Sequence, residues 1–220
     1  MEVHEKLIAY LHAHKKEMLL LWKNLVETES GPQQPSGVEA VRRILEGELA
    51  AMGFTVRLQQ ISGAPDLLIA EAGKREGEGS IILSGHIDTV FPAGKASTHP
   101  FFVDDEGYAH GPGVLDMKGG LVVSLYAVKA LNALSLVTHP IKFVFVTDEE
   151  TLHMHSNAKA VLRREITGAR AFLNFEPCAE NNQVVLSLWR RSRVHPCSWP
   201  CRPLWYESGK RTVCHIGSCP

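Results

Sequence analysis

The sequence has very little cysteine outside its last part. Only Cys178 precedes residue 188, although the chain of 220 residues contains five cysteines. A body almost free of cysteine excludes a disulfide framework and indicates a reducing compartment. Residues 1–6 also lack the basic region and apolar stretch that open a secretory signal. We therefore expect a cytoplasmic protein.

Long hydrophobic runs and an excess of either charge are also missing. No uninterrupted apolar run is longer than Met18–Trp22, far short of the roughly 20 residues that a helix needs to span a bilayer. The 23 Lys and Arg residues nearly balance the 24 Asp and Glu residues, which leaves a net charge of -1. We therefore expect no membrane partner and no nucleic-acid partner, because the electrostatic attraction that such binding needs is absent.

The first part of the chain shows helical periodicity. Apolar residues recur at three- and four-residue spacing over residues 3–26, which predicts one amphipathic helix. A turn over residues 30–36 separates it from a second helix. Ser36 and Glu39 have the spacing of a capping box at the start of that helix, and Gly53 is a natural stop.

The rest of the chain alternates short apolar segments with helical patterns. Helices are expected over residues 117–134 and 156–164. This alternation predicts an α/β fold, a three-layer αβα domain with a largely parallel central sheet. In such sheets the reactive groups collect beyond the carboxyl ends of the strands. The predicted strands cover residues 54–58, 67–70, 81–83, 141–147 and 171–175.

Four segments carry imidazole or carboxylate groups at or just after predicted strands and turns. They are Ser84–Thr89, Gly111–Gly120, Thr147–Glu150 and Asn174–Pro177. Taken singly, each has an ordinary interpretation: His-x-Asp triplets are mostly surface or capping residues, acid runs are solvated strand ends, and Gly-x-Gly turns are weak signals. Taken together, one imidazole and several carboxylates at the strand exits favour a site for zinc or a similar divalent ion.

His86 and Asp88 are the first pair in this set. They are two residues apart, so in extended backbone their side chains project to the same side. A carboxylate beside a histidine is the usual device that fixes the metal-binding tautomer of the ring. The pair therefore predicts a metal ligand and its orienting acid.

The four segments resemble, in order, the metal motifs of a known family. Gly85–Pro92, Gly111–Gly120, Thr147–Glu150 and Phe175–Pro177 are similar to those of the two-zinc amidohydrolases that include acetylornithine deacetylase, succinyl-diaminopimelate desuccinylase and glutamate carboxypeptidase. The Gly-Pro-Gly and Phe-Glu-Pro forms look closest to the glutamate carboxypeptidase branch. The resemblance implies that residues 1–187 are the N-terminal portion of a metallohydrolase catalytic domain.

The resemblance also implies the ligands of two zinc ions. His86 and Glu176 would bind one ion, Glu150 would bind the other, and Asp116 would bridge both. Cobalt or manganese could take the same places, because these metals share such ligand sets.

The remaining roles follow from the same resemblance. Asp88 would orient His86, and Glu149 would be the general base for a water shared by the two ions. The expected reaction is hydrolysis of an amide bond next to a C-terminal amino acid, in a small peptide or an N-acyl amino acid. His153 and His155, which follow the acid cluster, are interpreted as incidental rather than as ligands, and Cys178 as a small core residue.

The tail over residues 188–220 departs from this pattern. It holds four of the five cysteines and three of the four tryptophans, with one acid against six Lys or Arg. One interpretation is a zinc knuckle, with His195 or His215 joining the four cysteines Cys197, Cys201, Cys214 and Cys219. The other, which we favour, is an aberrant unstructured tail from a shifted reading frame.

The genetic code permits this frame shift. Moving Trp199–Tyr206 by one base allows Gly-Arg-Ala-Ala-His-Ser-Gly, which resembles the lid-domain motif of the family. The chain would then be truncated, without the inserted domain through which relatives form homodimers and without their last histidine ligand. On this interpretation we expect weak or absent hydrolysis, and the alternative function is a non-catalytic fragment of such an enzyme.

Overall fold

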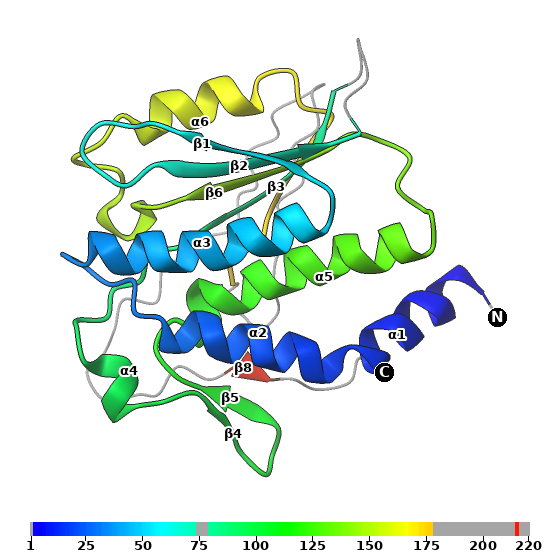
Figure 1. Ribbon diagram of the computed structural model, residues 1–220, viewed down its shortest axis with the longest axis horizontal. Helices are drawn as coiled ribbons and strands as arrows, with labels where there is room; N and C mark the ends of the chain where they lie inside the picture. The colour runs from blue at the N-terminus through cyan, green and yellow to red at the C-terminus, as the bar shows by residue number, and fades with distance from the viewer. Residues whose placement is uncertain (1, 74–78, 178–213, 216–220) are drawn as a thin grey trace, which may run out of the picture.

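The computed structural model describes residues 2–73, 79–177 and 214–215, and for the last two residues only the backbone. The main feature is a five-stranded sheet with helices on both faces (Figure 1). Its strand order is β1-β2-β6-β3-β7. The strands are β1 (Thr55–Gln59), β2 (Leu67–Ala72), β3 (Ile81–His86), β6 (Ile141–Val146) and β7 (Ala171–Asn174).

Four of the five strands run in the same direction. β2 is antiparallel to both of its neighbours, β1 and β6, whereas β3 is parallel to β6 and to β7. The largely parallel sheet expected from the sequence is therefore confirmed, with β2 as the exception. Because β3 lies between β6 and β7, the carboxyl ends of these three strands meet at one edge of the sheet.

The helices form the two outer layers. α6 (Ala158–Ile166) covers one face of the sheet, and α3 (Pro35–Ala51) and α5 (Gly120–Ala133) cover the other, with α1 (Val3–Ala13) and α2 (Lys15–Glu27) beyond them (Figure 1). The three-layer αβα arrangement is thus confirmed. No helix among the described residues is both long enough and apolar enough to cross a membrane.

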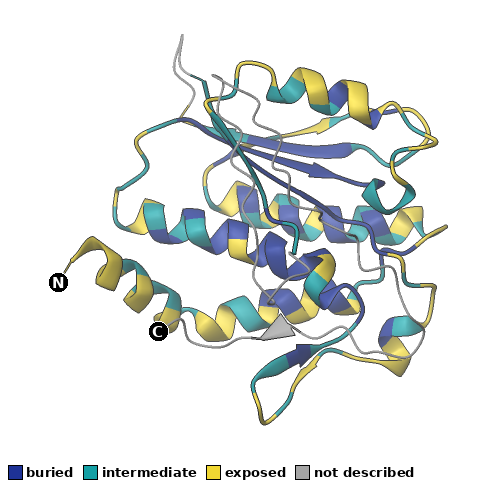
Figure 2. Cartoon of the chain, turned by 180° about the vertical axis from the view of Figure 1, so that it is seen from behind, coloured by how far each residue is buried: buried dark blue, intermediate teal, exposed yellow. Residues whose placement is uncertain are grey.

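The alternation of side chains along each strand divides the core between these layers. Phe143 and Phe145 of β6 pack in the cluster that also holds the apolar faces of α2, α3 and α5, whereas Val144 packs with Leu162 and Ile166 of α6. Every residue of β6 is buried, as expected for a strand covered on both faces. Figure 2 shows this buried central sheet between more exposed helices.

The amino-terminal helix differs from its prediction. The apolar period continues from residue 3 to residue 26, but the chain forms two helices that are separated at His14, where ψ is 9°. α1 has no buried residue, and its Leu11 packs on the core only partly buried, so core packing constrains the direction of α1 only weakly. The His14 ring also lies 2.7 Å from the Tyr10 carbonyl oxygen, a contact that occupies a carbonyl near the end of α1.

The predicted capping box of α3 is wrong. The helix begins at Pro35, and Gln34 is its N-cap without a side-chain cap hydrogen bond. Proline is favoured in the first turn because its φ is already helical and its missing N–H would have had no partner there. Ser36 therefore lies inside the helix. The predicted stop is confirmed, because Gly53 has a φ of 82°.

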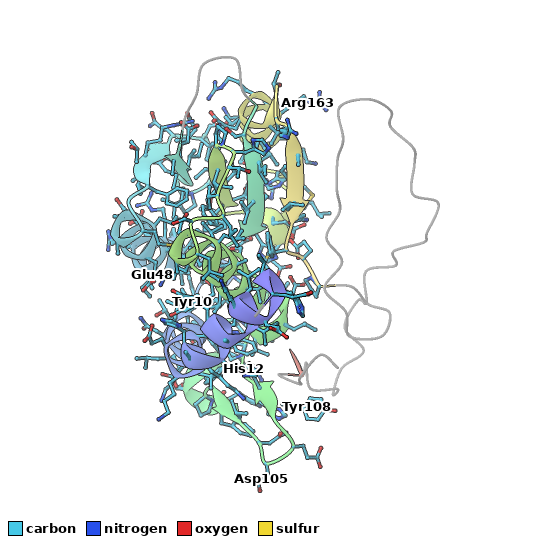
Figure 3. The ribbon with its side chains drawn as sticks, turned by 90° about the vertical axis from the view of Figure 1, so that its right-hand side faces the viewer. Tyr10, His12, Glu48, Asp105, Tyr108 and Arg163 are labelled. Carbon is cyan, nitrogen blue, oxygen red and sulfur yellow. The ribbon has the colours of Figure 1, made fainter. Side chains whose placement is uncertain are left out.

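A small second sheet was not predicted. It consists of β4 (Phe102–Val103), β5 (Tyr108–His110) and β8 (Cys214–His215), all antiparallel and too short to show an alternating pattern. Next to it is the short helix α4 (Lys95–Thr98). Asp105 and Tyr108 of this hairpin lie at the opposite end of the molecule from Arg163 of α6 (Figure 3). The predictions for Cys178 and for the remainder of the tail lie outside the described residues.

Candidate metal centre

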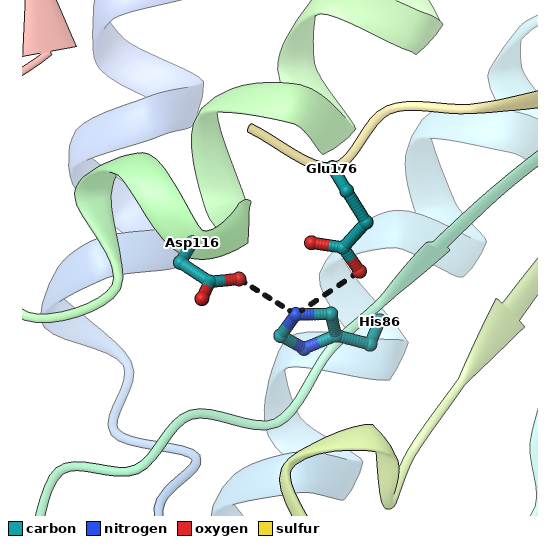
Figure 4. A group of neighbouring side chains, drawn as sticks. All are labelled: His86, Asp116 and Glu176. Atoms are coloured by element: carbon teal, nitrogen blue, oxygen red, sulfur yellow. Dashed lines mark hydrogen bonds and ion pairs between the residues drawn. The ribbon is translucent and has the colours of Figure 1, made fainter. Parts of the chain in front are cut away.

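Three distant segments place their polar side chains around one point at the carboxyl edge of the sheet. His86 is the last residue of β3, Glu176 follows β7, and Asp116 lies in the turn Val114–Gly119 that leads into α5. His86 Nε2 is 2.9 Å from Asp116 Oδ1 and 3.4 Å from Glu176 Oε1 (Figure 4). One donor atom from each residue lies within 4.8 Å of the others.

The His86 ring is held in one orientation. The residue is 1% exposed, and its Nδ1 lies 2.9 Å from the Asp88 backbone oxygen and 3.4 Å from Asp88 Oδ1. A carbonyl oxygen can only accept a hydrogen bond, so Nδ1 carries the proton. Nε2 is the nitrogen that faces the two carboxylates, as a metal ligand must.

The Asp88 carboxylate connects the first and third acid-bearing segments. Its Oδ1 accepts the backbone N–H of Glu149 at 3.1 Å, and its Oδ2 accepts that of Glu150 at 2.9 Å. These two glutamates begin the short 3-10 turn Glu149–Thr151 directly after β6. Asp88 thus fixes the backbone of the acid cluster relative to His86.

The two glutamates lie in an environment that disfavours negative charge. Burial raises the pKa of Glu150 to about 8. The positive charge of His86 opposes this rise, and the negative charges of Asp116, Asp88 and Glu149 add to it. Burial likewise raises the pKa of Glu149, with Glu176 among the contributing charges. Glu150 lies outside the close group of three, so the structure brings three of the four predicted ligands together.

The carboxylates favour a positive charge beside them. Burial lowers the pKa of the His86 ring, but contacts with Asp116, Asp88 and Glu176 outweigh burial and raise it well above its ordinary value. In the described part of the chain no Lys or Arg forms an ion pair with Asp116 or Glu176. A divalent cation would supply the missing charge, and one imidazole with several carboxylates is a donor set that suits zinc.

One interaction beside the site was not predicted from the sequence. Asp148 Oδ1 lies 2.6 Å from His153 Nδ1, and Asp148 Oδ2 accepts the Ser156 hydroxyl. These contacts close the loop that follows Glu150. His153, interpreted above as incidental, therefore holds the loop in place. It is not one of the three residues whose potential ligand atoms lie close together. The only signal for this contact in the sequence is that His153 lies five residues after Asp148. Neither the helical nor the strand period brings two side chains together at that spacing.

Comparison with known proteins identifies the relatives of this chain. The sequence pattern described as "Peptidase family M20/M25/M40" matches residues 82–214. Carboxypeptidase G2 of Pseudomonas sp. (strain RS-16) is 32% identical over 168 residues, which are 74% of this chain and 39% of that protein. Acetylornithine deacetylase of Pasteurella multocida is 34% identical over 110 residues, which are 49% of this chain and 28% of that protein.

Solved structures share the fold. Human carnosine dipeptidase 1 superimposes with a TM-score of 0.65 at 24% identity, over 78% of this chain and 41% of that chain. The dipeptidase Dug1p of Saccharomyces cerevisiae gives a TM-score of 0.68 at 16% identity, over 79% and 41%. The chain thus spans less than half the length of these relatives. Because the family pattern covers more than half of its residues, the chain belongs to peptidase family M20/M25/M40.

Proposed function

We propose that this chain carries the catalytic site of a zinc-dependent hydrolase, which cleaves a peptide or N-acyl amide bond next to a C-terminal amino acid. The observation that carries this proposal is the convergence of His86, Asp116 and Glu176 within 4.8 Å. Glu149 and Glu150 lie on a neighbouring turn, whose backbone N–H groups donate to the Asp88 carboxylate. Relatives named as a carboxypeptidase and a deacetylase support amide bonds as the substrate class.

The donor set divides between two ions in this proposal. His86 and Glu176 would hold the first, Glu150 would hold the second, and Asp116 would serve both. Zinc in this site would act as a Lewis acid that lowers the pKa of a water and polarises the amide carbonyl. Asp88 keeps the proton of His86 on Nδ1, so that the lone pair of Nε2 remains available to bind a metal ion.

Glu149 is the general base of the proposed reaction. Its carboxylate accepts a proton from the attacking water, and the same proton then goes to the leaving amine nitrogen, so the group ends as it began. Burial raises the pKa of Glu149, and this strengthens its carboxylate as a base. Glu149 and Glu150 are adjacent in the chain, so their side chains point in different directions and can take different roles.

The first test replaces the base without altering the ligands. We expect Glu149→Gln to lower the rate of hydrolysis of N-acyl glutamate or a dipeptide by about 10²–10⁴-fold, with the zinc stoichiometry unchanged. Titration calorimetry measures the zinc, and chromatographic detection of the released amino acid measures the turnover. Glu106→Gln, at an exposed residue in the turn between β4 and β5, is the matched control.

The outcomes of this test separate the two candidate functions. Turnover that depends on zinc and on Glu149 supports the hydrolase. Zinc binding that depends on His86, without any turnover, supports a non-catalytic chain that retains the metal site. A protein that binds no zinc, or one that hydrolyses equally well with Glu149→Gln, would contradict the proposed mechanism.

A further inference from the structure

The backbone amide of His86 lies where β3 loses its neighbour β7. The parallel pairing ends with Ser84 opposite Asn174, and Phe175 N still donates to Ser84 O at 3.1 Å. Beyond that point β7 has ended, so the next amide of β3 on this side has no strand carbonyl opposite it in the described part of the chain. His86 is buried, and a buried N–H without an acceptor is strongly disfavoured.

A thioether takes the place of that carbonyl. The His86 amide donates to Met117 Sδ, at a nitrogen-to-sulfur distance of 3.0 Å. Met117 is fully buried and directly follows Asp116 in the chain. A single side chain therefore connects the backbone at one metal donor, His86, with the backbone at another, Asp116.

Two glycines leave the space that this side chain occupies. A Cβ atom on Gly85 would lie 2.5 Å from Met117 Cε and 3.0 Å from Met117 Sδ. A Cβ atom on Gly120 would lie 3.1 Å from the same methyl group. Any larger residue at Gly85 would push the thioether away from the His86 amide. The motif residues Gly85, Met117 and Gly120 thus form one packed unit beneath the metal donors.

We propose that Met117 is a positioning residue for the metal site, and that its sulfur fixes the His86 backbone through the N–H···S hydrogen bond. The contact sets where the ring of His86 leaves the sheet and keeps its Nε2 opposite Asp116 and Glu176. This inference rests on the proposed function, because it assigns Met117 to the geometry of the same zinc site. A methionine that only filled the core would need its volume there but not its sulfur.

The test separates the sulfur from the volume. Met117→Leu keeps an apolar side chain of similar size and removes the acceptor. We expect exchange of the His86 amide with solvent to become about tenfold faster, as for loss of one hydrogen bond. Zinc affinity should fall by about 10–100-fold, as when the support of a metal ligand is lost. Hydrogen exchange by NMR and competition with a chromophoric chelator measure the two effects.

Two comparisons make the result specific. Met52→Leu changes a partly buried methionine that packs on the main core at the C-terminal end of α3, and it should leave both quantities unchanged. Replacement of all five methionines by selenomethionine keeps an acceptor and should preserve zinc affinity, whereas replacement by norleucine should reproduce Met117→Leu. The norleucine protein also supplies the measurement if Met117→Leu does not fold.

Failure of this inference differs from failure of the proposed function. Wild-type protein that binds no zinc would overturn the proposed function, and with it the role of Met117. Wild-type and Met117→Leu proteins that bind zinc equally would overturn the role of Met117 alone. Unchanged exchange at the His86 amide would show that the sulfur contact does not constrain the backbone, and would also overturn it.

Discussion

Among single residues, Asp88 connects two segments of the candidate metal centre, because it contacts His86 and both glutamates of the acid cluster. Its backbone oxygen holds the His86 ring, and its two carboxylate oxygens accept the N–H groups of Glu149 and Glu150. The side chain is nearly buried, at 8% exposure, so water cannot replace these contacts easily. Asp88 acts on the chemistry through the residues that it holds in place.

This arrangement predicts the effect of Asp88→Asn. The amide keeps the shape of the carboxylate, but its nitrogen cannot accept a hydrogen bond, so one of the two glutamate N–H groups loses its acceptor. We expect zinc affinity to fall by about 10–100-fold, the usual effect of losing a group that supports a metal ligand. A chelator competition titration measures it. Asp104→Asn is the control, because Asp104 also contacts a histidine, His110 at 2.6 Å, but in the hairpin. Equal loss in both variants would contradict the prediction.

The site residues could be predicted from the sequence to an uneven degree. His86, Asp116 and Glu176 were expected from the resemblance of their motifs, and for His86 and Glu176 there is also a physical reason, because the neighbouring parallel strands β3 and β7 end at one edge of the sheet. The contact of Asp148 with His153 could not be predicted. It occurs with positive φ at two successive residues, Leu152 and His153, at 55° and 53° respectively, a conformation that is uncommon outside glycine. The N–H···S contact of Met117 also depends on side-chain packing that motif spacing does not reveal.

At the scale of elements, an ionic network attaches α6 to the sheet. Lys142 of β6 lies 2.6 Å from Glu165 of α6 and 3.1 Å from Glu71 of β2. Arg57 of β1 also contacts Glu165, at 2.6 Å. Burial raises the pKa of Glu165, but Lys142 and Arg57 outweigh burial and hold it below its ordinary value. Glu165 therefore stabilises the packing of α6 in its charged form.

The lowered pKa gives a prediction with a definite sign. We expect Glu165→Gln to lower the free energy of unfolding by about 1–3 kcal/mol near neutral pH, as for a hydrogen bond to a charged group. Because the folded pKa lies below the unfolded value, the contribution is complete above pH 4.5 and is lost as pH falls through the folded pKa. Urea unfolding of both proteins across this range measures the difference.

The control for this prediction is an exposed pair of the same kind. Glu39→Gln removes the contact with Arg43 on the surface of α3, and exposed pairs contribute only about 0.2–1 kcal/mol. A loss in Glu165→Gln that stayed constant down to the lowest pH would contradict the assigned cause, since protonation must remove the advantage of the charge.

The elements themselves could be predicted where they bury a regular face. All five strands of the main sheet fall at their predicted positions to within a few residues, because the apolar segments of β2, β3 and β6 are buried. The reversed direction of β2 is not visible in such a segment, since its pattern reads the same either way. The break between α1 and α2 was missed for a similar reason: the apolar period continues through His14.

At the scale of the whole molecule, the metal centre collects negative charge from well-separated parts of the chain. Five carboxylates surround the single imidazole of His86, namely Asp88, Asp116, Glu149, Glu150 and Glu176. Their mutual repulsion opposes folding, because these groups lie apart in the unfolded chain. A bound cation would offset this repulsion, so the proposed metal binding would be thermodynamically linked to folding.

This linkage predicts a stability that depends on zinc. At a free zinc concentration of about 100 times Kd, the folded state should gain about 2.7 kcal/mol. Thermal unfolding should therefore shift to higher temperature with zinc and return with a chelator. His86→Ala should abolish the shift, whereas His99→Ala, at an exposed histidine beside α4, should preserve it. An equal shift in both variants would place the binding elsewhere.

The strand order has a consequence for synthesis on the ribosome. β3 lies between β6 and β7, and both of these neighbours come later in the chain. Until Ile141–Val146 and Ala171–Asn174 have emerged, the nascent β3 has two unpaired edges, and such edges invite association with other chains. We therefore expect stalled nascent chains that end before β6 to be bound by chaperones more strongly than those that extend past β7.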